Sequence, residues 1–391
     1  MKSIVKRNFL SELQAIDWDF VGENTSDAGV GLHWYPARFV PQIPSNLVGY
    51  FSEKGDTVLD PFCGCGTALL ESFRLDRKPI GIDINPVAIL ITKAKLTNIS
   101  IEQIESFTAK VTSSIAKKLL TKGDITVSAV PNLEENSRWY HPETLVELAS
   151  IYSVILDLDD NLPEKIISKC CFSAILNRVC SQDRHFGWIC DGVHPTELKY
   201  KKASEAFNQK LVQFTNFIGY FRQSLKATEP RVTTYEDVDI HQADSRDLTK
   251  LVSDNRVDLI ITSPPYLSVT DYNKSSRLTM LWFGPDNWEG LKQSEIGARF
   301  KRARKSSLED YIEDSHKYMA EFHRVLDNKK YLCLIIGESS SHPAYVELLL
   351  NIAQEIGFDR MQNIRRNISV KRRRLFPRVQ TEEIVILRKR K

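Results

Sequence analysis

A loop that could carry chemistry ends the run VDLIITSPPY at residues 257–266. The first five residues of this run are apolar or β-branched, which is typical of a central parallel strand. Pro264 and Pro265 must end that strand, because neither donates a ladder hydrogen bond and each fixes its own φ. The run therefore predicts a stiff loop with Ser263 and Tyr266 at the carboxyl edge of a sheet, where open α/β sheets place their sites. Two prolines alone would favour an ordinary strand-ending turn.

Three acids lie at the ends of predicted strands: Asp60 in VLDPFCGCGT, Asp83 in GIDINP and Asp244 in QADSRD. Gly64 and Gly66 allow a tight turn between the first strand and a following helix. Asp83 follows Asp60 by 23 residues, where an acid can accept hydrogen bonds from ribose hydroxyls. The glycine loop lacks the dinucleotide and P-loop phosphate motifs, so a pyrophosphate ligand is not favoured. A helix N-cap is the alternative role for any one acid, but three acids followed by TSPPY indicate a site.

The elements that must position these residues fall into two unlike parts. Strands are predicted at 56–60, 78–84, 238–242, 257–261, 331–336 and 383–387, and helices at about 67–74, 86–96, 308–326 and 343–356. From about residue 99 to 234 almost every stretch has helical spacing instead. We therefore expect an α/β core with a mostly parallel sheet, formed by residues 1–98 and 236–391 and interrupted by a large helical insertion at 99–235.

The composition fits a globular protein that acts in the cytoplasm. Of the 391 residues 42% are hydrophobic and 26% charged, and no apolar run approaches the roughly 18 residues that span a bilayer. The first residues carry acids and no apolar core, so no secretory signal or membrane partner is expected. Seven cysteines without the spacing of a disulfide scaffold indicate a reducing compartment.

The net charge of +3 conceals two basic clusters. One is RFKRARK, with Arg299, Lys301, Arg302 and Arg304, and the other is VKRRRLFPR, with Lys371, Arg372, Arg373 and Arg374. Such clusters suit the phosphates of a nucleic acid, and we name these eight residues as DNA-binding candidates. A solvated surface is the alternative for charge alone.

Five blocks together resemble the amino-directed S-adenosylmethionine-dependent DNA methyltransferases: LHWYPARFVPQIPSNLV, LDPFCGCGT, GIDINP, QADSRDL and TSPPY. The match covers residues 32–97 and 238–270, with weaker agreement in HRVLDNKKYLCLIIG and the final predicted strand. The sequence departs from the family at Cys65, where serine is usual, and in the long segment between GIDINP and QADSRDL. The resemblance implies a Rossmann-like methyltransferase core, S-adenosylmethionine as cofactor and double-stranded DNA as partner, with the insertion as the candidate target-recognition region.

The resemblance also implies a role for each matching residue. The methionine part of the cofactor would be lined by Asp60, Phe62, Gly64 and Gly66, the ribose would contact Asp83, and the adenine amine would contact Asp244. The expected cofactor site further includes Cys63, Thr67, Ile84 and Ser245, and, in the block that closes over the methionine end, His33, Tyr35, Pro36 and Arg38.

The catalytic loop would be Ser263, Pro264, Pro265 and Tyr266. An exocyclic amine on a base is a poor nucleophile, because its lone pair is delocalised into the ring. The Ser263 oxygen and the Pro264 carbonyl would accept the two amine hydrogens and direct the lone pair at the sulfonium methyl. The ring of Tyr266 would stack on the base, which must first be flipped out of the duplex.

Serine at the first position of this loop mostly accompanies cytosine N4 methylation among relatives, and Asp or Asn there mostly accompanies adenine N6. We therefore expect site-specific cytosine N4 methylation by a modification enzyme of a restriction-modification or related system, as a monomer or homodimer with a cognate restriction enzyme as partner. The alternatives are an adenine N6 DNA methyltransferase, a tRNA guanine-N2 methyltransferase and a non-catalytic nucleic-acid-binding module. Cytosine C5 chemistry is not favoured, because it needs a thiolate in a Pro-Cys loop.

The segment RVCSQDRHFGWICDGVHP contains residue types that could bind a metal. Cys180, His185, Cys190 and His194 are residue types that bind zinc, but their spacing is not that of a tight two-cysteine knuckle. No metal is expected there.

Overall fold

The computed structural model describes residues 9–23, 29, 31–36, 38, 40–120, 130–182, 194–285, 288–339, 344–368 and 379–391. Its framework is a seven-stranded sheet in the order β3-β2-β1-β4-β5-β7-β6. The strands are β1 (Thr57–Asp60), β2 (Lys78–Asp83), β3 (Asp239–Gln242), β4 (Val257–Thr262), β5 (Leu326–Ser339), β6 (Phe358–Asn367) and β7 (Val379–Lys389). The strands from β3 to β5 pair in parallel, and only β7 runs against its two neighbours. The predicted α/β class with a mostly parallel sheet is confirmed.

The chain leaves the centre of the sheet in two directions. From β1 it runs through α3 (Thr67–Arg74) to β2 and then into α4 (Pro86–Lys95), whereas from β4 it runs through α13 (Ser307–Val325) to β5 and then into α14 (Tyr345–Ile356). β1 and β4 are neighbours, with Val58 opposite Leu259 and Leu59 opposite Ile260. The loops that follow these two strands therefore begin side by side at the point where the strand order reverses, which is where open α/β sheets bind ligands.

Alternation along β5 separates the two faces of the sheet. Leu332, Leu334 and Ile336 belong to the hydrophobic core that includes α13 and α14. Cys333 and Ile335 face the opposite core, with α1 (Phe9–Gln14) and α2 (Gln42–Phe51). Because both faces are covered, β4 and β5 are apolar on both sides, as buried parallel strands require.

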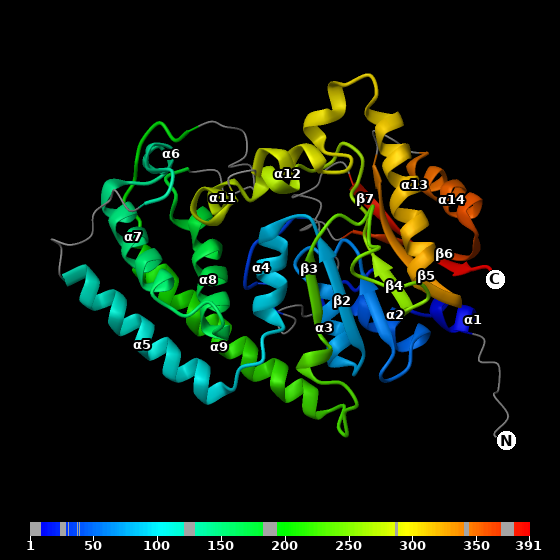
Figure 1. The fold of residues 1–391 in the computed structure, drawn as a ribbon, viewed down its shortest axis with the longest axis horizontal. Coiled ribbons are helices and arrows are strands. Elements are labelled where there is room, and N and C mark those ends of the chain that lie inside the picture. The colour runs from blue at the N-terminus through cyan, green and yellow to red at the C-terminus, as the bar shows by residue number, and fades with distance from the viewer. Residues whose placement is uncertain are drawn as a thin grey trace.

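The stretch that was expected to be helical holds α5 (Ile101–Leu120), α6 (Leu133–Ser137), α7 (Pro142–Leu156), α8 (Pro163–Val179) and α9 (Ala203–Lys226). Figure 1 shows these helices on one side of the sheet, beyond α4. α8 packs on α4 and α9 packs on α3, and all four helices share one hydrophobic core. The helices are thereby fixed to the α/β part through apolar contacts.

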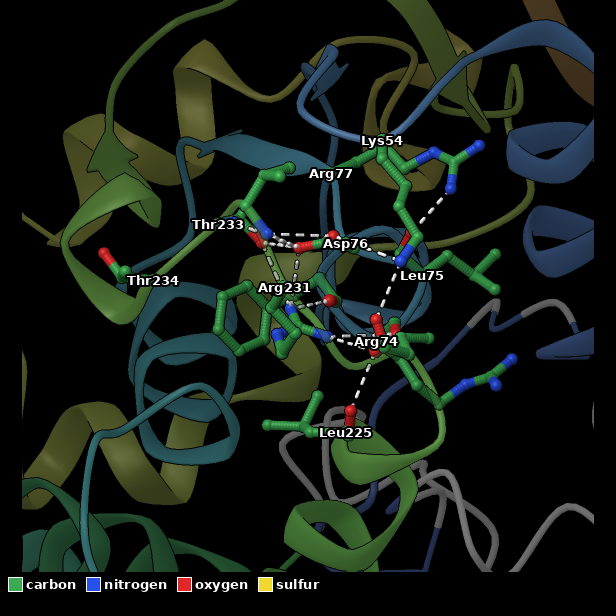
Figure 2. Close-up of polar contacts among 12 residues, drawn as sticks. Lys54, Arg74, Leu75, Asp76, Arg77, Leu225, Arg231, Thr233 and Thr234 are labelled. Atoms are coloured by element: carbon green, nitrogen blue, oxygen red, sulfur yellow. Dashed lines mark hydrogen bonds and ion pairs between the residues drawn. The ribbon is translucent and has the colours of Figure 1, made fainter.

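The chain returns from these helices through a buried polar junction (Figure 2). The Asp76 carboxylate, fully buried, accepts hydrogen bonds from the backbone N–H groups of Val232 and Thr233 and from the Thr233 hydroxyl. Arg231 Nη2 donates to the Phe73 carbonyl at 2.6 Å, and its guanidinium lies over the Phe73 ring. The junction therefore anchors the end of the helical stretch to the turn between α3 and β2.

Short elements follow β4 and cover the carboxyl edge of the sheet. They are α10 (Tyr272–Ser275), α11 (Arg277–Phe283), α12 (Trp288–Ser294) and the 3₁₀ helix η5 (Arg299–Ala303). α11 packs against α6 and α8, and in Figure 1 α11 and α12 run across the top of the view toward α13. None of the helices in the described part of the chain combines the length and apolarity needed to cross a bilayer.

Candidate active site

A cavity of about 810 Å³, including the space at its mouth, opens at the carboxyl ends of the central strands. Most of the predicted site residues line it: Tyr35, Arg38, Phe62, Cys63, Gly64, Thr67, Asp83, Ile84, Asp244, Ser245, Ser263 and Pro265. Six do not belong to its lining: His33, Pro36, Asp60, Gly66, Pro264 and Tyr266. The fold thus brings most of the predicted cofactor residues and the start of the predicted catalytic loop to one cavity.

The glycine loop is held open toward this cavity by α4. Gly64 has φ +50°, and a Cβ there would lie 3.1 Å from the Tyr35 ring, so only glycine fits without displacing that ring. Thr92 Oγ1 donates to the Gly64 carbonyl at 3.0 Å, and Lys95 Nζ donates to the Cys65 carbonyl at 2.8 Å. These two anchors were not foreseen, because nothing in the sequence of α4 distinguishes them from ordinary helix residues.

Gly66 acts beneath the loop instead of in the cavity wall. It is the N-cap of α3 with φ +76°, and a Cβ would lie 2.7 Å from Thr92 Oγ1. The residue therefore allows α3 to start close against α4.

Asp83 presents a carboxylate at the cavity wall. Its Oδ2 accepts from the Gly64 N–H at 2.9 Å and its Oδ1 accepts from the Asn85 N–H at 2.8 Å. Burial raises the pKa of Asp83 to about 6, although both hydrogen bonds act in the opposite direction. The carboxylate is therefore mostly ionised at neutral pH and has lone pairs left for hydroxyl donors.

Asp60 lies below the cavity floor, between the two central strands. Its Oδ1 accepts from the Thr262 hydroxyl at 2.7 Å and from the Phe62 N–H at 3.1 Å. Only 1% of the residue is exposed, and burial raises its pKa to about 7. In this position Asp60 supports both loops.

His33 connects the N-terminal block to α8. Its Nδ1 is 2.6 Å from the Trp34 carbonyl and its Nε2 is 2.7 Å from Ser173 Oγ. Burial lowers the pKa of His33 to about 3, so the ring is neutral at neutral pH. Because a carbonyl can only accept, Nδ1 carries the proton and Nε2 accepts from Ser173. Tyr35, by contrast, lines the cavity and stacks against Tyr272 with ring centroids 6.4 Å apart.

Asp244 is bound by an arginine that the sequence analysis did not single out. Arg246 Nε lies 3.0 and 3.1 Å from the two carboxylate oxygens of Asp244, and Arg246 Nη1 donates to Asp314 at 2.7 Å. The Asp244 side chain keeps 36% of its surface exposed, so acceptor positions are still open. Ser245 turns inward and donates to the Pro61 carbonyl. Arg246 thus fixes Asp244 at the cavity wall.

Five further lining residues come from the segment after the catalytic loop: Tyr272, Asn273, Ser294, Glu295 and Ile296. The Glu295 carboxylate accepts from the N–H groups of Tyr272 and Asn273 at 2.5 and 3.1 Å, and burial raises its pKa to about 7. Asn273 Oδ1 is buried and has no hydrogen-bond partner within the described part of the chain. No local pattern marked these residues, because Glu295 reaches α10 only through the fold.

The catalytic loop is fixed by hydroxyl groups. Ser263 Oγ donates to Tyr266 Oη at 3.0 Å, and Tyr266 Oη donates to the Ile335 carbonyl at 3.4 Å. The Tyr266 ring packs in the core beside α13 and α14 and is only 7% exposed, so little of it is accessible to a base in this arrangement. Stacking of Tyr266 on a base therefore stays a prediction that needs the ring to become more accessible.

The first basic cluster is joined to the chain that leaves the catalytic loop. The Arg299 N–H donates to the Thr270 carbonyl at 3.2 Å, and the Phe300 N–H donates to Asp271 Oδ1 at 2.9 Å. Lys301 and Arg304 lie over the Phe300 ring, and Arg302 is exposed. The second cluster, Lys371, Arg372, Arg373 and Arg374, lies outside the described residues.

Two of the four zinc-type residues are described. Cys180 Sγ donates to the Asn177 carbonyl, and His194 Nε2 lies 3.2 Å from Glu135 Oε1. His185 and Cys190 lie outside the described residues.

The polar lining of the cavity suits S-adenosylmethionine. Carboxylates of Asp83, Asp244 and Glu295 line it, which matches a ligand with a sulfonium, an ammonium and several hydrogen-bond donors. Arg38 also lines it, and its Nη1 donates to the His33 carbonyl at 3.1 Å.

The chain is similar in sequence to known DNA methyltransferases. A family model described as DNA methylase, for the N6 and N4 methyltransferases, matches residues 11–94 and 257–391, more than half of the chain. Type II methyltransferase M.MvaI of Kocuria varians is 25% identical over 67% of this chain and 59% of its own length. Type II methyltransferase M.MjaII of Methanocaldococcus jannaschii is 22% identical over 83% of this chain and 76% of its own. The match thus spans less than two thirds of M.MvaI.

Among solved structures, TrmN from Thermus thermophilus aligns with a TM-score of 0.34 and 11% identity, covering 94% of this chain and 52% of its own. The fold class follows from the strand order of the sheet.

Proposed function

Because the chain belongs to the N6/N4 family of DNA methylases, we propose that it transfers a methyl group from S-adenosylmethionine to the exocyclic amine of a base in double-stranded DNA. The predicted family is confirmed by that match, and S-adenosylmethionine is the methyl donor of the family. The observation that carries the proposal is the single cavity that joins the three carboxylates to Ser263 and Pro265.

The chain's own residues would hold the cofactor at both ends. Asp83, which lines the cavity, would accept hydrogen bonds from the ribose hydroxyls, and Asp244, held by Arg246, would accept from the adenine amine. Arg38, also in the lining, would pair with the carboxylate at the methionine end. When bound, the cofactor supplies an electrophilic methyl group on its sulfonium.

Ser263 and Pro264 would prepare the amine. The Ser263 hydroxyl donates a hydrogen bond to Tyr266 Oη, so the lone pairs of Ser263 Oγ can accept one amine hydrogen. Among the described residues nothing donates to the Pro264 carbonyl, which can accept the other hydrogen. Two fixed acceptors draw the lone pair out of conjugation and orient it, which is catalysis by positioning and electrostatics.

Cytosine N4 is the target that Ser263 favours. Among relatives, serine in this position mostly accompanies cytosine, whereas Asp or Asn mostly accompanies adenine. An adenine N6 enzyme would differ only in the part of the cavity that receives the base. The base must leave the duplex to reach the loop, because its amine is otherwise paired and stacked.

Phosphate contacts would come from the basic cluster beside the loop. Arg299, Lys301, Arg302 and Arg304 follow directly on backbone contacts to residues 270 and 271, so a phosphate bound there lies near the flipped base. The helices of the insertion, residues 99–235, would carry target recognition, since they are fixed to the core beside α4. Phosphate contacts position the duplex, whereas contacts to the base edges specify the target sequence.

A modification enzyme of a restriction-modification system is the biological role that we propose. M.MvaI and M.MjaII are both Type II methyltransferases, which favours this role over a tRNA guanine-N2 methyltransferase or a non-catalytic binding module. With DNA as its substrate the protein would act in the cytoplasm. A cognate restriction enzyme and a monomeric or dimeric state stay predictions.

The test is methyl transfer to unmethylated genomic DNA, followed by mass spectrometry of the nucleosides, with total tRNA as a parallel substrate. We expect 4-methylcytosine in the DNA and no gain of methyl groups in the tRNA. Finding 6-methyladenine would replace the base assignment and keep the reaction. Methylation of tRNA without DNA would overturn the DNA substrate.

A further inference from the structure

The Pro265 carbonyl in the catalytic loop meets two buried tyrosine hydroxyls. Tyr311 Oη from α13 lies 3.1 Å from the carbonyl oxygen, and Tyr345 Oη from α14 lies 3.0 Å from it. The two hydroxyl oxygens are 2.5 Å apart. Tyr311 is 1% exposed and Tyr345 is 4% exposed, so water does not compete for this carbonyl from their side.

The three oxygens make three contacts with one another, but only two hydroxyl protons are available to form hydrogen bonds in them. Each hydroxyl carries one proton, and the carbonyl carries none. Burial raises the pKa of both tyrosines, so both protons are present at neutral pH. In every arrangement that uses both protons within the triangle at least one hydroxyl donates to the Pro265 carbonyl, and the other donates to that carbonyl or to its partner hydroxyl. Either tyrosine can therefore hold the carbonyl when the other is absent.

Holding this carbonyl matters because of the two prolines. Both rings fix φ, so ψ is the remaining soft dihedral of each proline. A hydroxyl on the Pro265 carbonyl fixes the ψ of that residue. That restraint limits how far Pro264 and Ser263 can move relative to the cavity.

We propose that Tyr311 and Tyr345 are positioning residues that hold the catalytic loop through the Pro265 carbonyl, each able to replace the other. This inference rests on the proposed function, since it explains how the two acceptors for the amine keep their places. Neither tyrosine touches the reacting atoms.

The surroundings of Tyr311 support this role. Gly297 has φ +61°, and a Cβ there would lie 2.9 Å from the Tyr311 ring. The Gly297 carbonyl accepts from the Ser268 N–H at 2.8 Å. Because Gly297 has no side chain, its backbone can contact both the Tyr311 ring and Ser268, which follows the catalytic loop.

The test is a double-mutant cycle on kcat. Tyr311→Phe and Tyr345→Phe alone should each lower kcat less than about threefold, because the remaining hydroxyl holds the carbonyl. The double variant should lower kcat by at least about tenfold, beyond the product of the single effects, with the Kd for S-adenosylmethionine unchanged. The matched control is Tyr140→Phe, a buried tyrosine whose hydroxyl donates to the Leu176 carbonyl, away from the catalytic loop.

Hydrogen exchange separates positioning from general stability. In the double variant the amides of residues 266–269 should exchange faster, while those of α13 and α14 keep their protection. The proposal would be overturned if the decrease in kcat of the double variant equalled the product of the two single decreases. Faster amide exchange throughout α13 and α14 would overturn it as well. If the unaltered protein transfers no methyl group to DNA, the proposed function fails instead, and the exchange experiment still tests the anchor.

Discussion

The Thr262 hydroxyl at the end of β4 donates a 2.7 Å hydrogen bond to Asp60 Oδ1 at the end of β1. This bond joins the two strands where the sheet reverses its order. The glycine loop begins directly after Asp60, and the catalytic loop begins directly after Thr262. One buried pair thus fixes the spacing between the parts that we assign to the cofactor and to the base.

Removing this bond should destabilise the protein in a pH-dependent way. Thr262→Val keeps the shape but leaves Asp60 Oδ1 with one donor fewer, which should cost about 1–3 kcal/mol in the free energy of unfolding at pH 8. The cost should shrink at pH 5, where the Asp60 carboxyl, with its pKa raised to about 7 by burial, is mostly neutral. Urea denaturation at both pH values measures this, with Thr262→Ser as the control.

The sign of the Asp60 effect follows from its raised pKa. The folded state binds the Asp60 proton more tightly than the unfolded state. Protonation of Asp60 therefore stabilises the fold, and this contribution is complete below about pH 4 and is lost as the pH rises through about 7. Asp60→Asn should remove that part of the pH dependence. A Thr262→Val variant as stable as the unaltered protein at pH 8 would show that the pair is not a structural tie.

Asp83 should make cofactor binding depend on pH. Ribose hydroxyls donate best to an ionised carboxylate, and burial raises the pKa of Asp83 to about 6. The affinity for S-adenosylmethionine should therefore fall as the pH drops through about 6. Asp83→Asn should bind roughly 10- to 100-fold more weakly at pH 8, because it loses a hydrogen bond to a charged acceptor.

Calorimetric titrations between pH 5.5 and 8 test the Asp83 prediction. Glu295 also lines the cavity, and burial raises its pKa to about 7, so Glu295→Gln is titrated alongside to measure the contribution of that carboxylate to the pH dependence. If Asp83→Asn keeps the full pH dependence, another group is responsible.

Tyr266 separates two roles for one side chain. As a hydrogen-bond partner its hydroxyl accepts from the Ser263 hydroxyl, and as a stacking residue only its ring matters. Tyr266→Phe keeps the ring and should lower kcat by about tenfold, because the Ser263 hydroxyl can then rotate and spend its lone pairs elsewhere. Steady-state kinetics beside Ser263→Ala would show this, and the double variant should be no slower than Ser263→Ala. Full activity in Tyr266→Phe with loss in Tyr266→Ala would favour stacking instead.

The junction at Asp76 should contribute to stability without touching chemistry. Burial raises the pKa of Asp76, but hydrogen bonds from Thr233 and Val232 and the Arg231 charge outweigh it, so the pKa lies below its usual value. Asp76→Asn replaces one acceptor oxygen by a donor and should cost about 1–3 kcal/mol at pH 7.

That cost should be present above about pH 4 and disappear as the pH falls further, because stabilisation by a carboxylate with a lowered pKa is lost on protonation. Thermal unfolding across this range measures it, and Asp254→Asn on the exposed surface is the control. An unfolding midpoint at pH 7 that matches the control would contradict a structural role for the junction.

The parts of the fold that follow from local pattern were predictable from the sequence. The helix expected at 67–74 is α3 (Thr67–Arg74), because Gly66 supplies its N-cap and apolar residues recur at helical spacing. β6 (Phe358–Asn367) was missed, because FDRMQNIRRN is largely polar and only its pairing with β7 on one side makes it a strand. β5 extends beyond the apolar run at 331–336 for the same reason.

The residues that support the site were less predictable than those in its motifs. Asp83 and Ser263 were found because each sits in a recognisable block after a strand. Glu295 and Tyr345 reach the site from elements far away in the sequence, and no local spacing marks such contacts. Asp60 was found, but its place between two strands depends on a neighbour 202 positions further along the chain.

The most direct measurement is the single-turnover rate of methyl transfer to DNA by the unaltered protein and by Ser263→Ala, with S-adenosylmethionine and DNA both saturating. The account predicts that Ser263→Ala transfers the methyl group about 100-fold more slowly, as expected when one fixed polar partner of the reacting group is removed. The Kd for S-adenosylmethionine should not change. Equal rates in the two proteins would contradict the central claim that the Ser263 oxygen activates the amine.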